Sequence, residues 1–201
     1  MEYSSSLLQN LVDKFVKLPG IGKRTAIRLV LHLLKQDKKE LEEFGLLIAQ
    51  IKDKLKYCNI CHNIADEEIC DICNDKSRDK GIICIVEDLR DVLSIENTNQ
   101  YKGLYHVLGG LISPVDGVNP DMLKISSLIE RVKTKDIREI IFALSATMEG
   151  DTTAFFITKQ LKDMPIKFSL ISRGISIGSE IEFADEITLG RSIQFRVPYP
   201  L

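Results

Sequence analysis

The sequence of 201 residues has no long hydrophobic run. Every apolar stretch falls well short of the roughly 20 residues that a helix needs to cross a bilayer. The first six residues, Met1 to Ser6, also lack the basic residues and the apolar core that define a secretory signal peptide. These absences exclude a transmembrane helix, and we expect a soluble cytoplasmic protein.

Internal repeats, low-complexity linkers and a large net charge are missing as well. The formal net charge is -2 and 44% of the residues are hydrophobic, which is enough for one large core or a few small ones. The charge is unevenly distributed. Residues 1–57 contain eleven Lys and Arg against seven Asp and Glu (net +4), and the remainder contains sixteen against twenty-two (net -6). A polyanion would bind at the basic N-terminal part, although solvated helix faces explain the same charges equally well.

Cysteine is scarce, but four of the five cysteines form two Cys-x-x-Cys pairs, Cys58 with Cys61 and Cys70 with Cys73. Each pair can place two thiolates on one metal ion from a tight turn, and together they complete the four-sulfur tetrahedron of structural zinc. Disulfide bonds are the alternative, and we disfavour them because cytosolic thiols stay reduced. Four cysteine ligands leave no open coordination position, so the sequence predicts one zinc ion that stabilises the fold without catalysing a reaction.

Three other residues with possible chemistry receive structural interpretations. His62 follows Cys61 and could compete as a zinc ligand, but four cysteines suffice. Cys84 stands within the apolar run 82–86, and we expect a buried hydrophobic side chain there. His106 has no Ser or Cys nucleophile nearby in the sequence, so we expect it in a core or an interface.

Hydrophobic periodicity divides the chain into a helical part, the cysteine motif and an alternating part. Apolar residues at helical spacing predict helices over 4–17, 26–34 and 41–55, ahead of the cysteine motif at 57–74. Further along, strands are predicted at 82–86, 105–108, 140–144 and 166–171, and helices at 87–95, 120–133 and 152–162. Strands that alternate with helices favour a mostly parallel sheet covered by helices.

A glycine-containing loop, Leu18-Pro-Gly-Ile-Gly22, separates the first two predicted helices. Gly20 and Gly22 allow a tight turn and a close approach of the backbone to a ligand. The loop leads into a helix N-terminus, where free N–H groups and the helix dipole favour a phosphate, and Lys23, Arg24 and Arg28 add positive charge. The pattern resembles a helix-hairpin-helix, which binds the nucleic-acid backbone without reading its sequence. An ordinary helix–helix turn with surface cations is the alternative.

Acidic residues follow two of the predicted strands. Glu87 follows the run 82–86, and the run 140–144 leads into Ser145-Ala-Thr-Met-Glu-Gly-Asp151. The carboxyl ends of parallel strands are where such sheets place ligands and metals. The arrangement resembles the Toprim domain of primases and topoisomerases, in which one strand ends in Glu and another in Asp-x-Asp-x-Glu-Gly, with carboxylates that hold magnesium.

Two neutral side chains, Ser145 and Thr147, stand where the Toprim pattern has its aspartates. Neutral hydroxyl groups cannot replace that charge, so we expect no metal catalysis. Glu87, Glu149 and Asp151 could still hold a cation weakly, and solvated acids at strand ends are the favoured interpretation.

The C-terminal segment Arg173–Leu189 contains an apolar run that ends in acids and resembles a Walker B strand. A Gly-x-x-x-x-Gly-Lys-Ser/Thr loop, the phosphate-binding partner of such a strand, is missing from the whole sequence. We therefore expect packing or subunit contact at this segment rather than ATP binding.

Taken in order, these segments resemble the bacterial RecR family of recombination mediators. The family has a helix-hairpin-helix, a four-cysteine zinc motif, a Toprim domain and a C-terminal Walker-B-like segment, which correspond to 18–28, 58–73, about 81–172 and about 173–192. The most specific matches are 105–110, 113–117, 149–150 and 183–189, whereas 193–201 has no counterpart that we can assign. The resemblance implies an α+β multidomain fold, with a helical helix-hairpin-helix domain at 1–56, the zinc motif at 57–76, a Toprim domain at 80–172 and a C-terminal segment at 173–201.

The same resemblance implies a function in recombinational DNA repair. Family members are non-enzymatic, form a homo-oligomer (a dimer or a ring-like tetramer that can encircle DNA), and work with RecO and RecF to load RecA at gaps. On this basis we expect Arg24 and Arg28 to contact DNA independently of its sequence. Lys23, Gly20 and Gly22 would also belong to the DNA-binding site. Glu149 would belong to an acidic Toprim surface that meets RecO. A magnesium-dependent Toprim nuclease or primase-like enzyme is the alternative, and the missing aspartates disfavour it.

Overall fold

The computed structural model describes residues 5–198, and the chain divides after Leu55 into two compact units. The first unit is helical, and the second contains both sheets. No helix within the described residues combines the length and the hydropathy needed to cross a bilayer.

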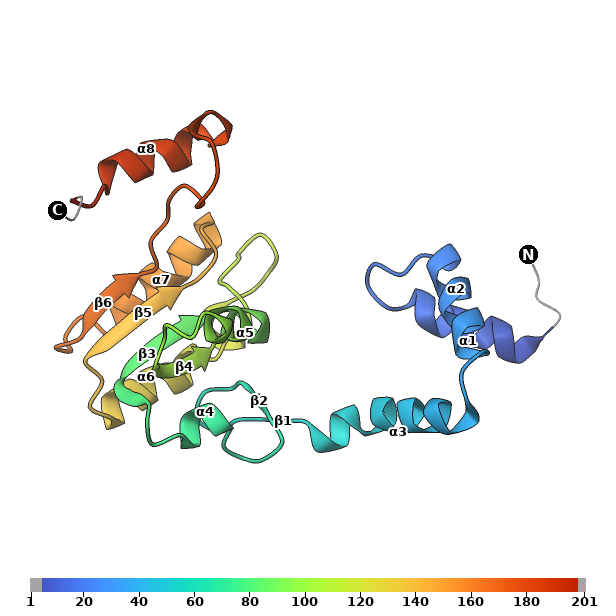
Figure 1. Cartoon of the computed structure of the whole chain (residues 1–201). Coiled ribbons are helices and arrows are strands. Elements are labelled where there is room, and N and C mark those ends of the chain that lie inside the picture. Colours follow the sequence, from blue (N-terminus) through green and yellow to red (C-terminus); the bar gives the residue numbers. More distant parts are fainter. Residues whose placement is uncertain (1–4, 199–201) are drawn as a thin grey trace. The chain divides into compact units, whose positions relative to one another are not determined.

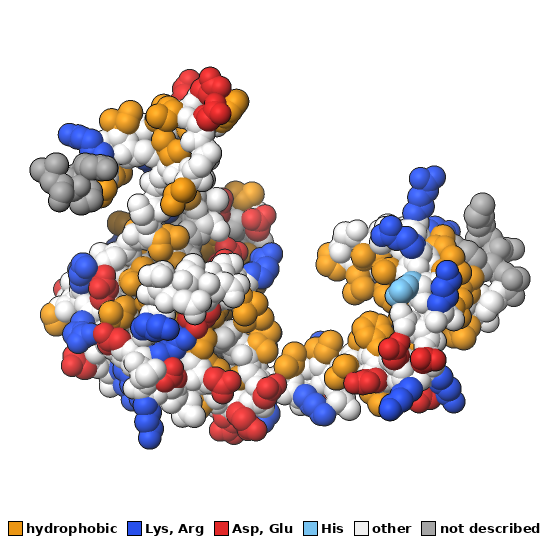
Figure 2. All heavy atoms as spheres, in the orientation of Figure 1, with side chains coloured by type: hydrophobic (Ala, Val, Ile, Leu, Met, Phe, Trp, Pro, Cys, Tyr) orange, Lys and Arg blue, Asp and Glu red, His pale blue; other side chains and the backbone are white. Residues whose placement is uncertain are grey.

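The first unit consists of helices α1 (Ser6–Val16), α2 (Lys23–Leu33) and α3 (Lys38–Lys54). The three predicted helices are confirmed. Ser5 caps α1 by accepting a hydrogen bond from the Leu8 N–H, and residue 4, where the prediction began, lies outside the described residues. The α1–α2 pair packs through Val12, Ala26 and Val30. Hydrophobic side chains also lie on the surface of this unit (Figure 2).

The second unit begins with a zinc knuckle, the name used here for residues 56–75. Strand β1 (Lys56–Tyr57) pairs antiparallel with β2 (Ile64–Ala65), and a short helix α4 (Asp71–Asn74) follows. The knuckle leads directly into the main sheet.

The main sheet has four parallel strands in the order β4-β3-β5-β6 (Figure 1). These are β3 (Asp79–Val86), β4 (Gly103–Val107), β5 (Glu139–Ala143) and β6 (Lys167–Leu170). Helices α5 (Leu89–Asn97), α6 (Ile125–Thr134) and α7 (Met148–Gln160) connect them. The α+β fold with a parallel sheet is therefore as predicted, since all four strands and their connecting helices are present.

Side-chain alternation along β3 gives the sheet two buried faces. Ile83 and Ile85 join the larger core with Leu128 of α6 and Ile157 of α7. On the other face, Cys84 and Val86 pack with Val92 of α5 and Tyr105 of β4. Cys84 is thus buried, as predicted.

The helix predicted over 120–133 is interrupted, and this part of the prediction is wrong. A 3₁₀ turn, η1 (Pro120–Met122), is separated from α6 by the extended residue Leu123 and by Lys124, the N-cap of α6. Leu123 is buried in the larger core, and the Lys124 N–H donates to the carbonyl of Leu108 at the end of β4 (2.9 Å). Tertiary contacts therefore override the helical periodicity at this point.

The C-terminal segment is helical, and the Walker-B-like strand that the sequence suggested is absent from the described residues. The chain leaves β6 and forms a 3₁₀ turn, η2 (Ile181–Phe183), followed by α8 (Glu186–Gln194) (Figure 1). Asp185 accepts a hydrogen bond from the Thr188 N–H (2.9 Å), so this acid caps a helix and does not end a strand. Residues 199–201 lie outside the described part.

Candidate metal centre and nucleic-acid interface

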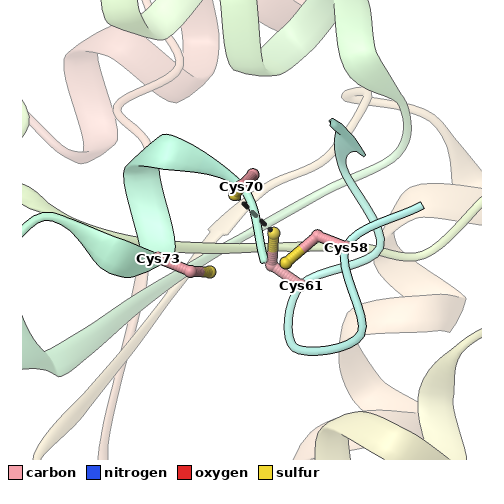
Figure 3. A group of neighbouring side chains, drawn as sticks. All are labelled: Cys58, Cys61, Cys70 and Cys73. Carbon is pink, nitrogen blue, oxygen red and sulfur yellow. Dashed lines mark hydrogen bonds between the residues drawn. The ribbon is translucent and has the colours of Figure 1, made fainter. Parts of the chain in front are cut away.

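The four paired cysteines converge in the zinc knuckle. The sulfur atoms of Cys58, Cys61, Cys70 and Cys73 all lie within 4.8 Å of one another and all four residues are buried (Figure 3). A tetrahedral ion with Zn–S bonds of about 2.3 Å places its sulfurs about 3.8 Å apart, so the four sulfurs are close enough to share one ion. Cys61 Sγ and Cys70 Sγ, one from each pair, are 3.5 Å apart. The cluster fits a structural zinc ion.

Local hydrogen bonds explain why each Cys-x-x-Cys pair turns its thiols to one point. The His62 N–H donates to the Cys58 carbonyl (2.9 Å), which closes the first turn, and the Ile60 N–H points at Cys58 Sγ (3.5 Å). Cys70 is the N-cap of α4, so Cys73 lies within the first turn of that helix. His62 binds Ser127 Oγ through Nε2 (2.7 Å), so its imidazole is committed outside the cluster.

Hydrogen bonds among three of the cysteine thiols shift their pKa values in opposite directions. Hydrogen bonding with Cys61 lowers the pKa of the Cys70 thiol, and the same hydrogen bond raises the pKa of Cys61 to about 12. Hydrogen bonding with Cys61 also raises the pKa of Cys73. Zinc binds cysteine as the thiolate, and the divalent ion supplies the positive charge that stabilises several thiolates at one point.

The knuckle is joined to the edge strand of the main sheet. The Val107 N–H of β4 donates to the Cys61 carbonyl (2.8 Å). Arg131 of α6 donates to the carbonyl of Tyr105 in β4 (2.7 Å) and to that of Ile60 in the knuckle (3.5 Å). We therefore expect the folding of the metal site to be coupled to the folding of strand β4.

The glycine hairpin, residues 18–22, forms the turn between α1 and α2. The Ile21 N–H donates to the Leu18 carbonyl (3.1 Å), and Gly20 has a φ of +76°, in the left-handed region that side chains disfavour. Gly22 is different, because its φ of -82° is ordinary and a Cβ there would meet no atom within 4 Å. Nothing in the described part of this unit therefore requires glycine at position 22.

The N-terminus of α2 has the features of an anion site. Gly22 provides no side-chain cap, and the first backbone hydrogen bond runs from the Ala26 N–H to the Gly22 carbonyl. The preceding N–H groups of α2 are therefore free to bind a ligand. Lys23, Arg24 and Arg28 are all exposed, and the two arginines lie one turn apart on the same side of α2.

The predicted strand-end acids partly converge. Ser145 Oγ donates to Glu87 Oε2 (3.2 Å), which joins the ends of β3 and β5. Glu87 and Glu149 line one cleft of about 400 Å³, and Asp116 lines it too. We name this surface the acidic cleft. Asp116 was not predicted there, because the loop 113–117 has no strand periodicity, although its Ser-Pro and Asp-Gly pairs did indicate an ordered loop.

The two hydroxyl side chains at the Toprim aspartate positions have structural partners. Ser145 binds Glu87, and Thr147 caps α7 by accepting from the Gly150 N–H (3.3 Å). Gly150 is required sterically, because a Cβ there would lie 2.0 Å from the carbonyl oxygen of Ser145.

Asp151 does not line the acidic cleft, which argues against the alternative that Glu87, Glu149 and Asp151 hold a cation together. It is paired with Arg173 (2.7 Å), whose guanidinium lowers the pKa of the Asp151 carboxyl. Among residues 5–198, the four cysteines are the only group of three or more His, Cys, Asp or Glu side chains placed to hold a metal ion together. His106 is a core residue, because its side chain is fully buried and its Nε2 lies 2.8 Å from the Lys124 carbonyl. This burial lowers the pKa of His106 to about 3.

Four family models match consecutive parts of the chain. They describe the RecR helix-hairpin-helix (residues 8–51), the RecR zinc finger domain with four cysteines (55–75), the Toprim domain (81–172) and the RecR C-terminal region (174–197). These matches include the glycine hairpin, the zinc knuckle and the acidic cleft.

Curated proteins resemble the chain over nearly its whole length. Recombination protein RecR of Flavobacterium johnsoniae is 57% identical over 199 residues, which cover 99% of this chain and 97% of the relative. Recombination protein RecR of Cytophaga hutchinsonii is 58% identical over 98% of this chain and 96% of the relative. The protein of the same name from Amoebophilus asiaticus is 52% identical over 99% of this chain and the whole relative.

Proposed function

Since the chain belongs to the RecR family of recombination proteins, we propose that it is a non-enzymatic DNA-binding mediator of recombinational repair. It binds DNA without reading sequence, acts with RecO and RecF, and promotes loading of RecA at gaps. The observation that carries the DNA-binding part is the uncapped N-terminus of α2 behind the glycine hairpin, flanked by Arg24 and Arg28. Its test is whether replacing both arginines by alanine lowers the DNA affinity and flattens its dependence on salt.

We assign the zinc ligands to Cys58, Cys61, Cys70 and Cys73, with one ion per chain. The closeness of the four sulfurs supports this assignment, and the coupling to β4 supports a structural role. Reduced thiols are needed for zinc binding, which supports a cytoplasmic location. The domain limits proposed from the sequence, 1–56, 57–76, 80–172 and 173–201, are retained as part of the proposal.

A homo-oligomer, a dimer or a ring-like tetramer, is part of the proposal. None of the 17 residues of α3 is buried, and Leu46, Leu47, Ile48 and Ile51 are all at least half exposed. A helix with so much apolar surface is stabilised when a second copy covers it. Several hairpins in one assembly would also give an affinity that a single hairpin lacks.

We propose that Glu149 serves partner recognition. It lines the acidic cleft and lies in the first turn of α7, where its charge is available to a basic partner surface. Glu149→Lys is expected to weaken binding of RecO by about 100-fold, because a like-charge contact costs several kcal/mol. The measurement is a calorimetric titration with RecO, accompanied by circular dichroism and native mass.

The matched control is Glu130→Lys, an exposed charge reversal on α6 that lies outside the acidic cleft. It should leave RecO affinity unchanged. If Glu149→Lys binds RecO as tightly as the wild type, Glu149 is not at the interface.

We propose further that the chain has no nuclease, topoisomerase or primase activity. Phosphoryl transfer in a Toprim frame needs carboxylates that hold a divalent cation. Here the two positions hold neutral residues instead. Ser145 donates a hydrogen bond to Glu87, and Thr147 caps α7. Supercoiled, nicked and single-stranded DNA incubated with magnesium or manganese should remain intact, as judged by gel electrophoresis. Reproducible cleavage by the wild type that disappears in Glu87→Gln would favour the enzyme alternative.

A further inference from the structure

A pocket of about 500 Å³ lies where the zinc knuckle meets the main sheet. Residues 57 and 62–64 of the knuckle form one wall, and residues 107–109 at the end of β4 form another. Its volume is within the roughly 300–1,000 Å³ of small-ligand sites. The carboxyl ends of parallel strands are the usual place for ligands in such sheets. Neither zinc binding nor the proposed contact of the glycine hairpin with DNA uses this pocket.

An aromatic side chain stands at the rim of the pocket. Tyr57 lines it and is 71% exposed, although its backbone is fixed by pairing with Ile64 across β1 and β2. Val107, Leu108 and Met122 line the pocket with apolar surface. An exposed ring on a fixed backbone beside an apolar pocket is suited to stacking against another flat ring.

Polar groups around the pocket match a nucleotide. Asn63 lines it and has a buried Oδ1 atom that finds no hydrogen-bond partner among the described residues. An amide both donates and accepts, as the edges of nucleobases do. Asp88 also lines the pocket, but its charge is matched by Arg90. Lys124 also lines the pocket, is exposed, and has no ion-pair partner in residues 5–198. The charged residues that line the pocket therefore include one unpaired positive charge.

We propose that this pocket takes an unstacked nucleobase of single-stranded DNA, with the base against Tyr57 and an adjoining phosphate near Lys124. The proposal rests on the proposed DNA binding and extends it. Stacking on an aromatic ring tolerates every base, because each base has a π-face. Bases of a duplex are paired and stacked, so they cannot enter without being flipped out. The pocket therefore distinguishes single strands from duplex, which a hairpin that contacts only the backbone cannot do.

The test compares Tyr57→Ala with Tyr57→Phe in the full-length protein. Affinities are measured by fluorescence anisotropy for a mixed-sequence single strand and for a blunt duplex of the same length. Loss of the ring should weaken single-strand binding at least about five-fold and leave duplex binding unchanged. Tyr57→Phe keeps the stacking ring and should bind like the wild type. Phe155→Ala is the matched control, since Phe155 is 70% exposed on α7 and lies outside the pocket.

A second measurement reports stacking directly. A single strand that carries 2-aminopurine should lose fluorescence on binding the wild type, and this quenching should disappear in Tyr57→Ala. Unchanged single-strand affinity in Tyr57→Ala, or an equal loss for single strand and duplex, would overturn the pocket proposal and leave the hairpin proposal intact. If the wild type binds neither form of DNA, the proposed function itself fails.

Discussion

Cys61→Ala is expected to yield a protein whose second unit does not fold. Structural zinc sites supply about 10–16 kcal/mol of apparent binding free energy, which is comparable to the whole stability of a typical domain, about 5–15 kcal/mol. Cys61 also accepts the Val107 N–H through its carbonyl, so disorder at the knuckle reaches β4. Circular dichroism and metal analysis of purified protein provide the measurement, and a chelator added to the wild type should have the same effect.

Cys84→Ala is the matched control for the zinc prediction. Cys84 is equally buried, but it packs in the smaller core against Val92 and Tyr105 and belongs to no metal cluster in the described part of the chain. Its loss should cost only about 1 kcal/mol and leave one zinc ion per chain. A Cys61→Ala protein that contains no zinc yet unfolds cooperatively at the wild-type temperature would refute a structural role for the ion.

The double substitution Arg24→Ala with Arg28→Ala should weaken DNA binding without unfolding the protein, because both side chains are exposed. Each phosphate contact releases counterions, so wild-type affinity should fall steeply as salt concentration rises. Loss of two contacts should flatten the slope of log affinity against log salt by about two. Anisotropy titrations of one oligonucleotide at several salt concentrations measure both the affinity and the slope.

Lys52→Ala with Lys54→Ala removes the same charge from the exposed last turn of α3 in the same unit. This control keeps the net charge of the two double variants equal, so it separates a local contact from a general loss of positive charge. If both double variants weaken binding equally at every salt concentration, or if neither does, the hairpin is not the DNA site.

Local patterns are enough to predict much of this structure. The zinc cluster follows from spacing, because each Cys-x-x-Cys pair is closed by hydrogen bonds within a few residues, as between His62 and Cys58. All four strands of the main sheet are predictable because each contains a short apolar run. Most residues of β3, β4 and β5 are buried, whereas those of β6 are half-buried or exposed. The turn at Gly20 can also be predicted from the sequence, because a backbone with positive φ favours glycine.

Features that depend on distant residues are not predictable in this way. The break at Leu123 and Lys124 depends on a hydrogen bond to Leu108, and Asp151 is separated from the acidic cleft by its ion pair with Arg173.

The C-terminal helix illustrates how one residue type fits two patterns. An acid after an apolar run resembles the end of a strand, but Asp185 stands three residues before Thr188, which is the position of an N-cap. The contacts of Arg24 and Arg28 with DNA, and of Glu149 with a partner, stay predictions.

The hydrogen bond from Ser145 to Glu87 has a consequence for how the acidic cleft responds to cellular ions. In a cleft with an aspartate at 145, two carboxylates would repel each other unless a cation lay between them, and the shape of the cleft would vary with ion occupancy. The Ser145 hydroxyl supplies Glu87 with a neutral donor in place of that cation. This link between the ends of β3 and β5 needs no magnesium, so the surface of the acidic cleft should be the same whether the ion is abundant or depleted.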